Sequence, residues 1–273
     1  MKGLELAYAR DRAMADGLAG MPCRLEGGGR SAVVVSPADE PLWAVRVDLD
    51  AGASLAWESD HGEEALFVLS GDLAVDDVPC PTRGAVVVEA DAYPTVRATS
   101  DAAVVYLGHR PTGVAAGKRG RRVHVFGPDG DFRLHGGGHD VVMFVDATCD
   151  GCDLMLFTTS RADAHVQTPH SHSQDEIIYL LDGEITMGSY RFDAGDALAI
   201  EADRRYGFRS EDGYRFLNFR PALSWMTERD GTVRPEGGAS NNLPPTGDRV
   251  DLDWGRPNRG RPNRGQPAGP TTL

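Results

Sequence analysis

The sequence predicts an all-β protein, and three observations support this fold class. Short runs of aliphatic and aromatic residues alternate with Gly, Pro and Asp along most of the chain, as in "SAVVVS", "EALFVLSG" and "EIIYLLDG", which is typical of β-strands joined by turns. Beyond the first ~20 residues, no stretch keeps a helical period for long. The strand pattern also occurs twice along the chain. We therefore expect a β-sandwich or a β-barrel, preceded by one short helix.

The two halves of the chain share one plan. Glu64 and Gly71 recur 112 positions later as Glu176 and Gly183, and the sequence "EAD" recurs at the same offset. Each half ends on a strand that contains an aromatic residue, "VVYLGHRP" and then "RFLNFRP". This spacing predicts a duplicated all-β unit of ~110 residues.

We expect three segments: residues 1–118, residues 119–234 and a tail over residues 235–273. The tail is rich in Pro, Gly, Asn and Arg and contains "GRPNR" twice in tandem. Such a composition buries too little apolar surface to offset the entropy of ordering. The tail should therefore be mobile, except where the apolar residues of 250–254 could dock.

Charge and hydropathy argue against two classes of partner. The formal net charge is -13 and the pI is near 5.0, whereas nucleic acids are bound by clusters of Lys and Arg. No run of ~18 apolar residues occurs, and the N-terminus lacks the apolar core of a signal peptide. The sequence predicts a soluble, cytoplasmic protein with no nucleic-acid partner and no membrane partner.

The cysteine content agrees with a reducing compartment, because four cysteines are too few for a disulfide framework in a chain of 273 residues. Cys149 and Cys152 form "CDGC", which has the spacing of half a zinc knuckle or of a redox couple. However, Asp-Gly is also the preferred centre of a tight hairpin turn, and no second CxxC occurs in the sequence. We interpret the pair as two thiols that face each other across a hairpin.

The stretch "TPHSHSQDEIIYLLDGEI" carries the main functional signal. On a β-strand, His170 and His172 project to the same face, where neutral imidazoles can bind a divalent ion. Glu176 adds a carboxylate just before a run of strand-forming residues. A polar surface segment is the alternative, but the spacing, the following Gly183 and the repeat together favour a metal site.

These residues also carry a family resemblance. "HSHSQDEIIYLLDG" resembles the first motif of the cupin superfamily, and "FDAGDALAIEADRRYGF" resembles its second motif. The resemblance is to a bicupin and covers most of residues 31–223, although the first half shows it only through the repeat. It implies two tandem, jelly-roll-like cupin β-barrels, with any metal held inside a barrel.

One residue departs from the family pattern. Cupins with a full metal set typically carry a His in the second motif, where this chain has Tyr206, and no His follows His172. The remaining ligands, His170, His172 and Glu176, are the two-His, one-carboxylate set of non-haem iron(II) oxygenases, which leaves coordination positions open. Tyr206 could be a fourth ligand, a general acid or base beside the cation, or a packing residue.

The first half has lost this histidine pattern. Glu58, Asp60 and Glu64 stand at the corresponding positions, with His61 one residue late. We expect a degenerate metal site and a solvated strand end in a structural unit. His165 could support the ligands of the second half from outside the ligand set. The other histidines lie in Gly- and Arg-rich segments, where we expect loops: His109, His124, His135 and His139.

Three functions remain open. The first, which we favour, is an oxygenase in which iron(II) binds a small chelating substrate and oxygen. The second is a non-redox isomerase, cyclase, decarboxylase or lyase, with manganese, zinc or nickel as Lewis acid and Tyr206 moving a proton. The third is a bicupin that binds a small ligand without catalysis.

In each case the expected partner is a small molecule, and exposed edge strands could also form a homodimer. The residues expected to line the barrel mix aromatic, aliphatic and polar side chains, which suits a small and partly apolar molecule. They are Phe157, Thr159, Ile178, Tyr179, Met187, Phe208, Phe216 and Asn218.

Overall fold

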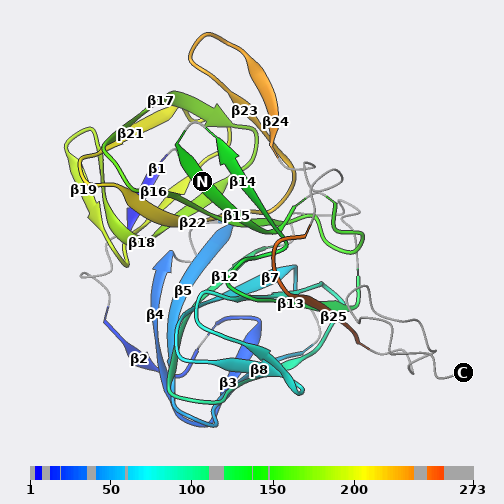
Figure 1. Cartoon of the computed structure of the whole chain (residues 1–273). Coiled ribbons are helices and arrows are strands. Elements are labelled where there is room, and N and C mark those ends of the chain that lie inside the picture. Colours follow the sequence, from blue (N-terminus) through cyan, green and yellow to red (C-terminus); the bar gives the residue numbers. More distant parts are fainter. Residues whose placement is uncertain are drawn as a thin grey trace, which may run out of the picture.

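The computed structural model describes residues 4–7, 13–18, 20–35, 41–58, 61–110, 120–136, 138–146, 148–236 and 245–254. Within these ranges every regular element is a β-strand and none is a helix (Figure 1). The prediction of an all-β protein is therefore confirmed. The described part of the chain contains no helix, and therefore none that is long and apolar enough to cross a membrane.

The predicted N-terminal helix is wrong in the part of that segment that the structure describes. This part contains two short strands, β1 (Leu4–Ala7) and β2 (Ala15–Asp16). β1 pairs antiparallel with β20 (Ala197–Ile200), from Leu4 opposite Ile200 to Ala7 opposite Ala197. The other edge of β20 pairs with β18 (Glu176–Met187), so β1 covers an edge that would otherwise stay open. Tertiary pairing has overridden a weak helical preference.

The described part of the first half forms two sheets that pack around one apolar core, and we call this assembly the N-terminal unit. One sheet has the order β2-β4-β5-β12-β7-β10-β13-β25, and the other has the order β3-β6-β11-β8-β9. Alternate residues of both sheets are buried together, among them Val45, Val47, Leu55 and Val75. The strand bounds are β3 (Cys23–Glu26), β4 (Gly29–Val35), β5 (Leu42–Leu49), β6 (Ser54–Trp57), β7 (Glu64–Ser70), β8 (Leu73–Val75), β9 (Val78–Cys80), β10 (Ala85–Val88), β11 (Thr95–Ala98), β12 (Ala102–His109), β13 (Arg122–Phe126) and β25 (Arg249–Asp253).

The second half forms one large curled sheet, which we call the C-terminal unit (Figure 1). Its path is β14-β15-β16-β22-β18-β21-β17-β23-β24, with β19 and β20 also paired to β18. The curl encloses a core rich in aromatic residues, including Tyr206, Phe208, Tyr214 and Phe216. The remaining strand bounds are β14 (Phe132–Gly136), β15 (His139–Val145), β16 (Met155–Arg161), β17 (His165–His172), β19 (Tyr190–Asp193), β21 (Tyr206–Ser210), β22 (Tyr214–Arg220), β23 (Ser224–Thr227) and β24 (Val233–Glu236).

The internal repeat is visible in the backbone. Gly71 and Gly183 adopt almost the same left-handed conformation, with φ of 73° and 72°. A Cβ at Gly71 would lie 2.2 Å from the Asp101 carbonyl oxygen, and a Cβ at Gly183 would lie 2.4 Å from the Gly213 carbonyl oxygen. These partners are themselves 112 positions apart. Both glycines are therefore required by the same turn in the same fold.

The chain crosses between the units at three places. β1 pairs within the C-terminal unit, whereas β13 and β25 pair with each other and extend the sheet of the N-terminal unit. The predicted linear segments 1–118, 119–234 and 235–273 therefore do not coincide with the pairing of these strands. β25 is the docking segment expected near residue 250, while residues 255–273 lie outside the described part of the chain.

A further apolar cluster lies between the units. It joins Phe67 and Val105 of the N-terminal unit to Phe144, Tyr179 and others of the C-terminal unit. On β18, Ile178 belongs to the core of the C-terminal unit, whereas its neighbour Tyr179 faces the other unit. Successive side chains of β18 point to opposite faces of the sheet, so one face packs in the core of the C-terminal unit and the other faces the N-terminal unit.

Candidate functional site

The four residues predicted to form the site come together in the C-terminal unit. His170 and His172 are at the end of β17, Glu176 begins β18 and Tyr206 begins β21. His170 lies opposite Tyr206 in the pairing of β17 with β21. The ring centroid of His170 is 4.9 Å from that of His172 and 4.6 Å from that of Tyr206. All four side chains are buried.

A fifth residue, Arg220, lies among them and was not predicted. It ends β22, and the residue is buried with 2% exposure. Its Nε and Nη2 donate to Oε2 of Glu176 at 3.2 and 3.0 Å. Its Nη2 also lies 3.2 Å from Nε2 of His172. The hydroxyl of Tyr206 donates to the other oxygen of Glu176, so both carboxylate oxygens have partners.

Glu236, at the end of β24, completes the network. It accepts a hydrogen bond from Nη1 of Arg220 at 2.8 Å and lies 2.6 Å from Nδ1 of His172. Because a guanidinium only donates, Nε2 of His172 must accept from Arg220, and Nδ1 must carry the proton that Glu236 accepts. These contacts match the tautomer of His172 that carries its proton on Nδ1 and directs the Nε2 lone pair at Arg220.

The charges in this network fix the protonation of its members. Burial is the largest single effect on Glu176 and raises the pKa of its carboxyl, but Arg220, His172 and the hydrogen bonds from Tyr206 and Arg220 together outweigh it and lower that pKa. The same balance lowers the pKa of Glu236 to about 2. Burial and then the charge of Glu176 raise the pKa of Tyr206 well above that of a free phenol. Tyr206 is thus a protonated donor, which gives no support to its predicted role as a base.

This arrangement does not fit a divalent metal ion. The donor atoms of His170, His172 and Glu176, all described residues, do not lie within 4.8 Å of one another as a group. The His172 lone pair and the Glu176 carboxylate, which a metal would need, both face the permanent positive charge of Arg220. The prediction that these three residues are ligands stays a prediction, and Arg220 argues against it.

His170 differs from His172 because one of its nitrogens is free. Its Nδ1 donates to the carbonyl oxygen of Thr168 at 2.9 Å, which leaves the lone pair on Nε2. Nε2 has no hydrogen-bond partner among the described residues. Burial lowers the pKa of His170, so the ring is neutral near pH 7. His165 bonds to Oε1 of Gln167 at 3.1 Å, but the amide nitrogen of Gln167 and Nδ1 of His170, 3.3 Å apart, are both donors. The supporting role of His165 stays a prediction.

Unpaired polar atoms also occur on the inner face of the C-terminal unit. Phe157, Asn218 and Ile178 lie side by side on three neighbouring strands and so share this face. Within the described part of the chain, the buried Oδ1 of Asn218 and the buried Nε2 of His139 have no hydrogen-bond partner. Such atoms are rare in folded proteins, and an ordered water, an ion or a ligand can satisfy them.

The matching place in the N-terminal unit is buried, so the predicted solvated strand end is wrong except at Glu58, which is exposed. Oε2 of Glu64 accepts from Nε1 of Trp57 at 2.5 Å and from the hydroxyl of Tyr106. With only neutral donors around it, burial raises the pKa of Glu64 to about 8. Asp60 lies outside the described residues. The unit thus keeps the glutamate of the motif as a neutral, packed group.

The histidines expected in loops lie on strands instead, at β12 (His109), β13 (His124), β14 (His135) and β15 (His139). Cys149 and Cys152 do not flank a two-residue turn, because β15 ends at Val145 and β16 begins at Met155. They lie in the longer loop between these paired strands.

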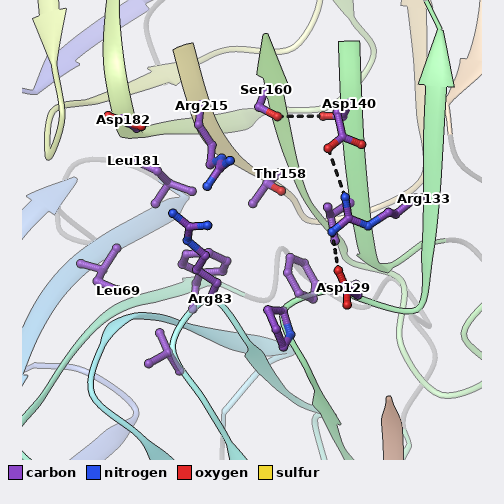
Figure 2. A pocket seen from close by; sticks show the side chains of 15 residues that line it. Leu69, Arg83, Asp129, Arg133, Asp140, Thr158, Ser160, Leu181, Asp182 and Arg215 are labelled. Carbon is purple, nitrogen blue, oxygen red and sulfur yellow. Dashed lines mark hydrogen bonds and ion pairs between the residues drawn. The ribbon is translucent and has the colours of Figure 1, made fainter. Parts of the chain in front are cut away.

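A pocket of about 310 Å³ lies between the two units (Figure 2). Arg83 of the N-terminal unit and Arg215 of the C-terminal unit point toward each other across it. On another wall, Arg133 bonds to Asp129 and Asp140. None of the predicted site residues lines this pocket.

Comparisons with known proteins agree with the fold. No family model and no curated protein matches the sequence. Among solved structures, a candidate glyoxylate-induced protein from Pseudomonas aeruginosa has a TM-score of 0.61 and 15% identity, over 80% of this chain and 88% of that chain. A candidate dioxygenase from Nostoc punctiforme has a TM-score of 0.60 and 11% identity, over 86% and 87% of the two chains.

A third similar structure is the formate complex of an oxalate decarboxylase from Lactobacillus farciminis. Its TM-score is 0.58 at 12% identity, over 87% of this chain and 89% of that chain. Identities this low bear on fold and not on activity. The chain shares the fold of these three structures.

Proposed function

We propose that this cupin binds a small polar molecule inside its C-terminal unit and acts on it by acid–base chemistry, without a metal at His170, His172 and Glu176. The observation that carries the proposal is Arg220, whose guanidinium faces both Glu176 and the lone pair of His172. The Arg220 guanidinium, on β22, thus neutralises the Glu176 carboxylate that a metal ion would otherwise bind.

The free polar atoms suggest the chemistry of the ligand. Nε2 of neutral His170 and Oδ1 of Asn218 are both acceptors, and neither has a partner among the described residues. A ligand that satisfies them must therefore carry O–H or N–H groups. Phe157 lies beside Asn218 in the sheet, and Phe208 and Phe216 share an aromatic core with Tyr206. This apolar setting suits a small molecule held by a few polar contacts.

Arg220 does not supply a binding site for an anion. Its donors already face Glu176, Glu236 and His172. Two carboxylates therefore accompany one guanidinium in the network, which disfavours a negatively charged ligand nearby. We expect an uncharged ligand, such as an amide, a urea or a polyol. His170, neutral and with a bare Nε2, is the group able to take a proton from it.

The second candidate is the metal-dependent enzyme, either an iron(II) oxygenase or a non-redox lyase or isomerase. One distance favours it: Nε2 of His172 is 3.7 Å from Oε1 of Glu176, close enough for both to bind one ion if Arg220 moved away. The similar structures include a candidate dioxygenase and an oxalate decarboxylase. In this case the ion supplies Lewis-acid or oxygen chemistry, and His170, His172 and Glu176 hold it.

Binding measurements on the full chain test the two candidates. A panel of uncharged amides, ureas and polyols, with carboxylic acids as the contrasting set, is screened by thermal shift in EDTA and then by calorimetry. The affinity for a compound that binds in EDTA should decrease at least tenfold in His170→Ala and in Asn218→Leu. Val166→Ala, at a side chain that is 71% exposed on the same strand as His170, is the matched control.

Metal analysis of Arg220→Met gives the second readout. Removal of the guanidinium frees Glu176 and His172, so this variant should bind added cobalt(II) in the C-terminal unit although the parent does not. The proposal is wrong if the parent already holds an ion that His172→Ala removes, or if every hit requires that ion.

A further inference from the structure

A second group of ligand-type side chains lies where the two units meet. Glu89, His124, Cys149 and Cys152 are all buried, and one donor atom from each lies within 4.8 Å of the others. Nε2 of His124 is 2.9 Å from Oε1 of Glu89 and 3.6 Å from Sγ of Cys149. Sγ of Cys149 is 3.8 Å from the same Glu89 oxygen. Ligands of a tetrahedral zinc ion, with bonds of ~2.0 to 2.3 Å, are about 3.3 to 3.8 Å apart.

The backbone around Glu89 is shaped to bring this carboxylate in. A Cβ at Gly151 would lie 2.1 Å from Oε1 of Glu89, and a Cβ at Gly120 would lie 1.7 Å from Oε2. A larger residue at either position would push the Glu89 carboxylate out of its present place. Gly151 lies between the two cysteines, so the CDGC loop packs directly onto the carboxylate. Oε2 accepts from the backbone N–H of Arg122 at 2.7 Å, which leaves Oε1 directed at His124 and Cys149.

The other nitrogen of His124 is held by a carboxylate. Oδ1 of Asp251 lies 2.8 Å from Nδ1 of His124, and Arg249 on the same strand bonds to Asp251 at 2.7 Å. A carboxylate on one ring nitrogen fixes the tautomer in which the other nitrogen offers its lone pair, as is usual for histidines that bind zinc. In this structure Nε2 lies 2.9 Å from Oε1 of Glu89 and shares a proton with it, so a metal ion would replace that proton between the same two atoms.

In the structure Cys149 and Cys152 form a disulfide, with Cα atoms 5.5 Å apart. We propose that, once a thiol or phosphine reductant has supplied the two electrons that open this disulfide, the two thiolates, Nε2 of His124 and a carboxylate oxygen of Glu89 bind one zinc ion. Two sulfur ligands with one imidazole and one carboxylate suit zinc. Binding releases to solvent the two thiol protons and the proton shared by His124 and Glu89.

Four protein ligands leave no open position, so this zinc is structural. It ties together Glu89 and His124 of the N-terminal unit and the loop between β15 and β16 of the C-terminal unit. Through Asp251 it also holds β25. The site is separate from the one proposed to bind the small molecule, and its loss would loosen the junction between the units without removing His170 or Asn218.

Zinc stoichiometry tests the inference on the full chain. The protein is reduced with a phosphine, loaded with zinc, dialysed and measured by mass spectrometry of the metal. We expect about one zinc per chain in the parent, in Cys80→Ala and in His172→Ala, and less than a tenth of that in the double variant Cys149→Ser with Cys152→Ser. Cobalt(II) in place of zinc should give thiolate-to-metal charge-transfer absorption.

Asp251 offers a finer test. Asp251→Asn should weaken zinc binding ~10- to 100-fold, measured by competition with a chelating dye. Asp253→Asn, on the same strand and largely exposed in an ion pair with Arg122, should leave it unchanged.

Three results would overturn the proposal. The reduced parent could bind no zinc, the double serine variant could keep it, or the cobalt form of the parent could lack the thiolate band. The last result needs no variant, so it decides the matter even if the double serine protein does not fold. Any of them would mean that these residues form only a disulfide beside an ion pair.

Discussion

The same substitution at the two equivalent glutamates should have opposite effects on stability. Glu64 and Glu176 occupy the same place in the repeat, and both are buried. Neutral donors surround Glu64, whereas Arg220 pairs with Glu176. Glu64→Gln replaces a carboxyl that is already protonated in the folded protein. Glu176→Gln removes a charge on which a buried guanidinium depends.

The magnitude for Glu64 follows from proton linkage. Its pKa is raised from 4.5 to about 8 in the folded protein, so between these values the unfolded chain has released a proton that the folded chain keeps. Stability contributed by this group is therefore full below pH 4.5, falls as pH rises and is lost near pH 8. Between pH 5 and pH 7 the loss is roughly 2 to 3 kcal/mol. Glu64→Gln should abolish this part of the pH dependence.

The sign is reversed for Glu176. Its pKa is lowered, so its contribution is present above the unfolded pKa and is lost only as pH falls through the folded value. At pH 7, Glu176→Gln leaves Arg220 buried with Glu236 as its remaining carboxylate. Breaking a buried ion pair on one side costs about 3 to 5 kcal/mol, so this variant should be strongly destabilised.

Urea unfolding at pH 5, 6, 7 and 8 measures both effects. Trp43 and Trp57 lie in the core of the N-terminal unit, and their fluorescence reports on that unit, while circular dichroism follows the whole chain. We expect the fluorescence midpoint of Glu64→Gln to vary less with pH than that of the parent. Equal pH slopes in parent and variant would mean that Glu64 is ionised when folded, and the account of the N-terminal unit given above would be refuted.

Three smaller predictions follow from the same contacts. Tyr206→Phe removes one hydrogen bond to a charged acceptor, so unfolding free energy should fall by ~1.5 to 3 kcal/mol in urea while the affinity for a bound ligand changes little. A tenfold loss of affinity would instead show that the phenol contacts the ligand. Glu58→Ala, at an exposed side chain, should change stability by less than ~0.5 kcal/mol, and a larger change would indicate an unseen partner. Burial lowers the pKa of His170 below the ordinary imidazole value of 6.5. Ligand affinity should therefore stay constant near neutral pH and decrease only when the pH is below 6.5. Calorimetry across pH checks this, and a loss of affinity that begins above pH 6.5 would contradict it.

The fold was predictable because its signal is local and occurs twice. Alternation along "EIIYLLDG" and "EALFVLSG" depends only on one face of each strand being buried, and Gly71 and Gly183 mark the same turn. The prediction of an N-terminal helix was wrong because β1 is stabilised by pairing with β20, nearly two hundred positions away. A run of four residues carries no sign of such a partner.

The candidate site was predicted in part for a similar reason. His170, His172 and Glu176 lie within one motif, and the structure does bring them together. Arg220 could have been suspected, since on β22 it is two and four residues from Asn218 and Phe216 and so shares their face. Glu236 could not be suspected, because it lies in the segment, residues 235–273, that we expected to be a mobile tail. His124 and Glu89 become neighbours of the CDGC pair only through tertiary structure.

Metal content alone will not identify the working site of this protein. If the junction binds zinc through Cys149 and Cys152, the purified chain carries a metal whether or not the C-terminal unit does. A cupin fold with one bound metal would then suggest the wrong ligands. Substitutions at the C-terminal site distinguish the two cases. The amount of metal bound at the junction should not change in Arg220→Met or in His172→Ala. Metal binding in the C-terminal unit should increase when Arg220→Met removes the guanidinium and decrease in His172→Ala. The response to these two substitutions, and not the amount of metal, tells which site holds it.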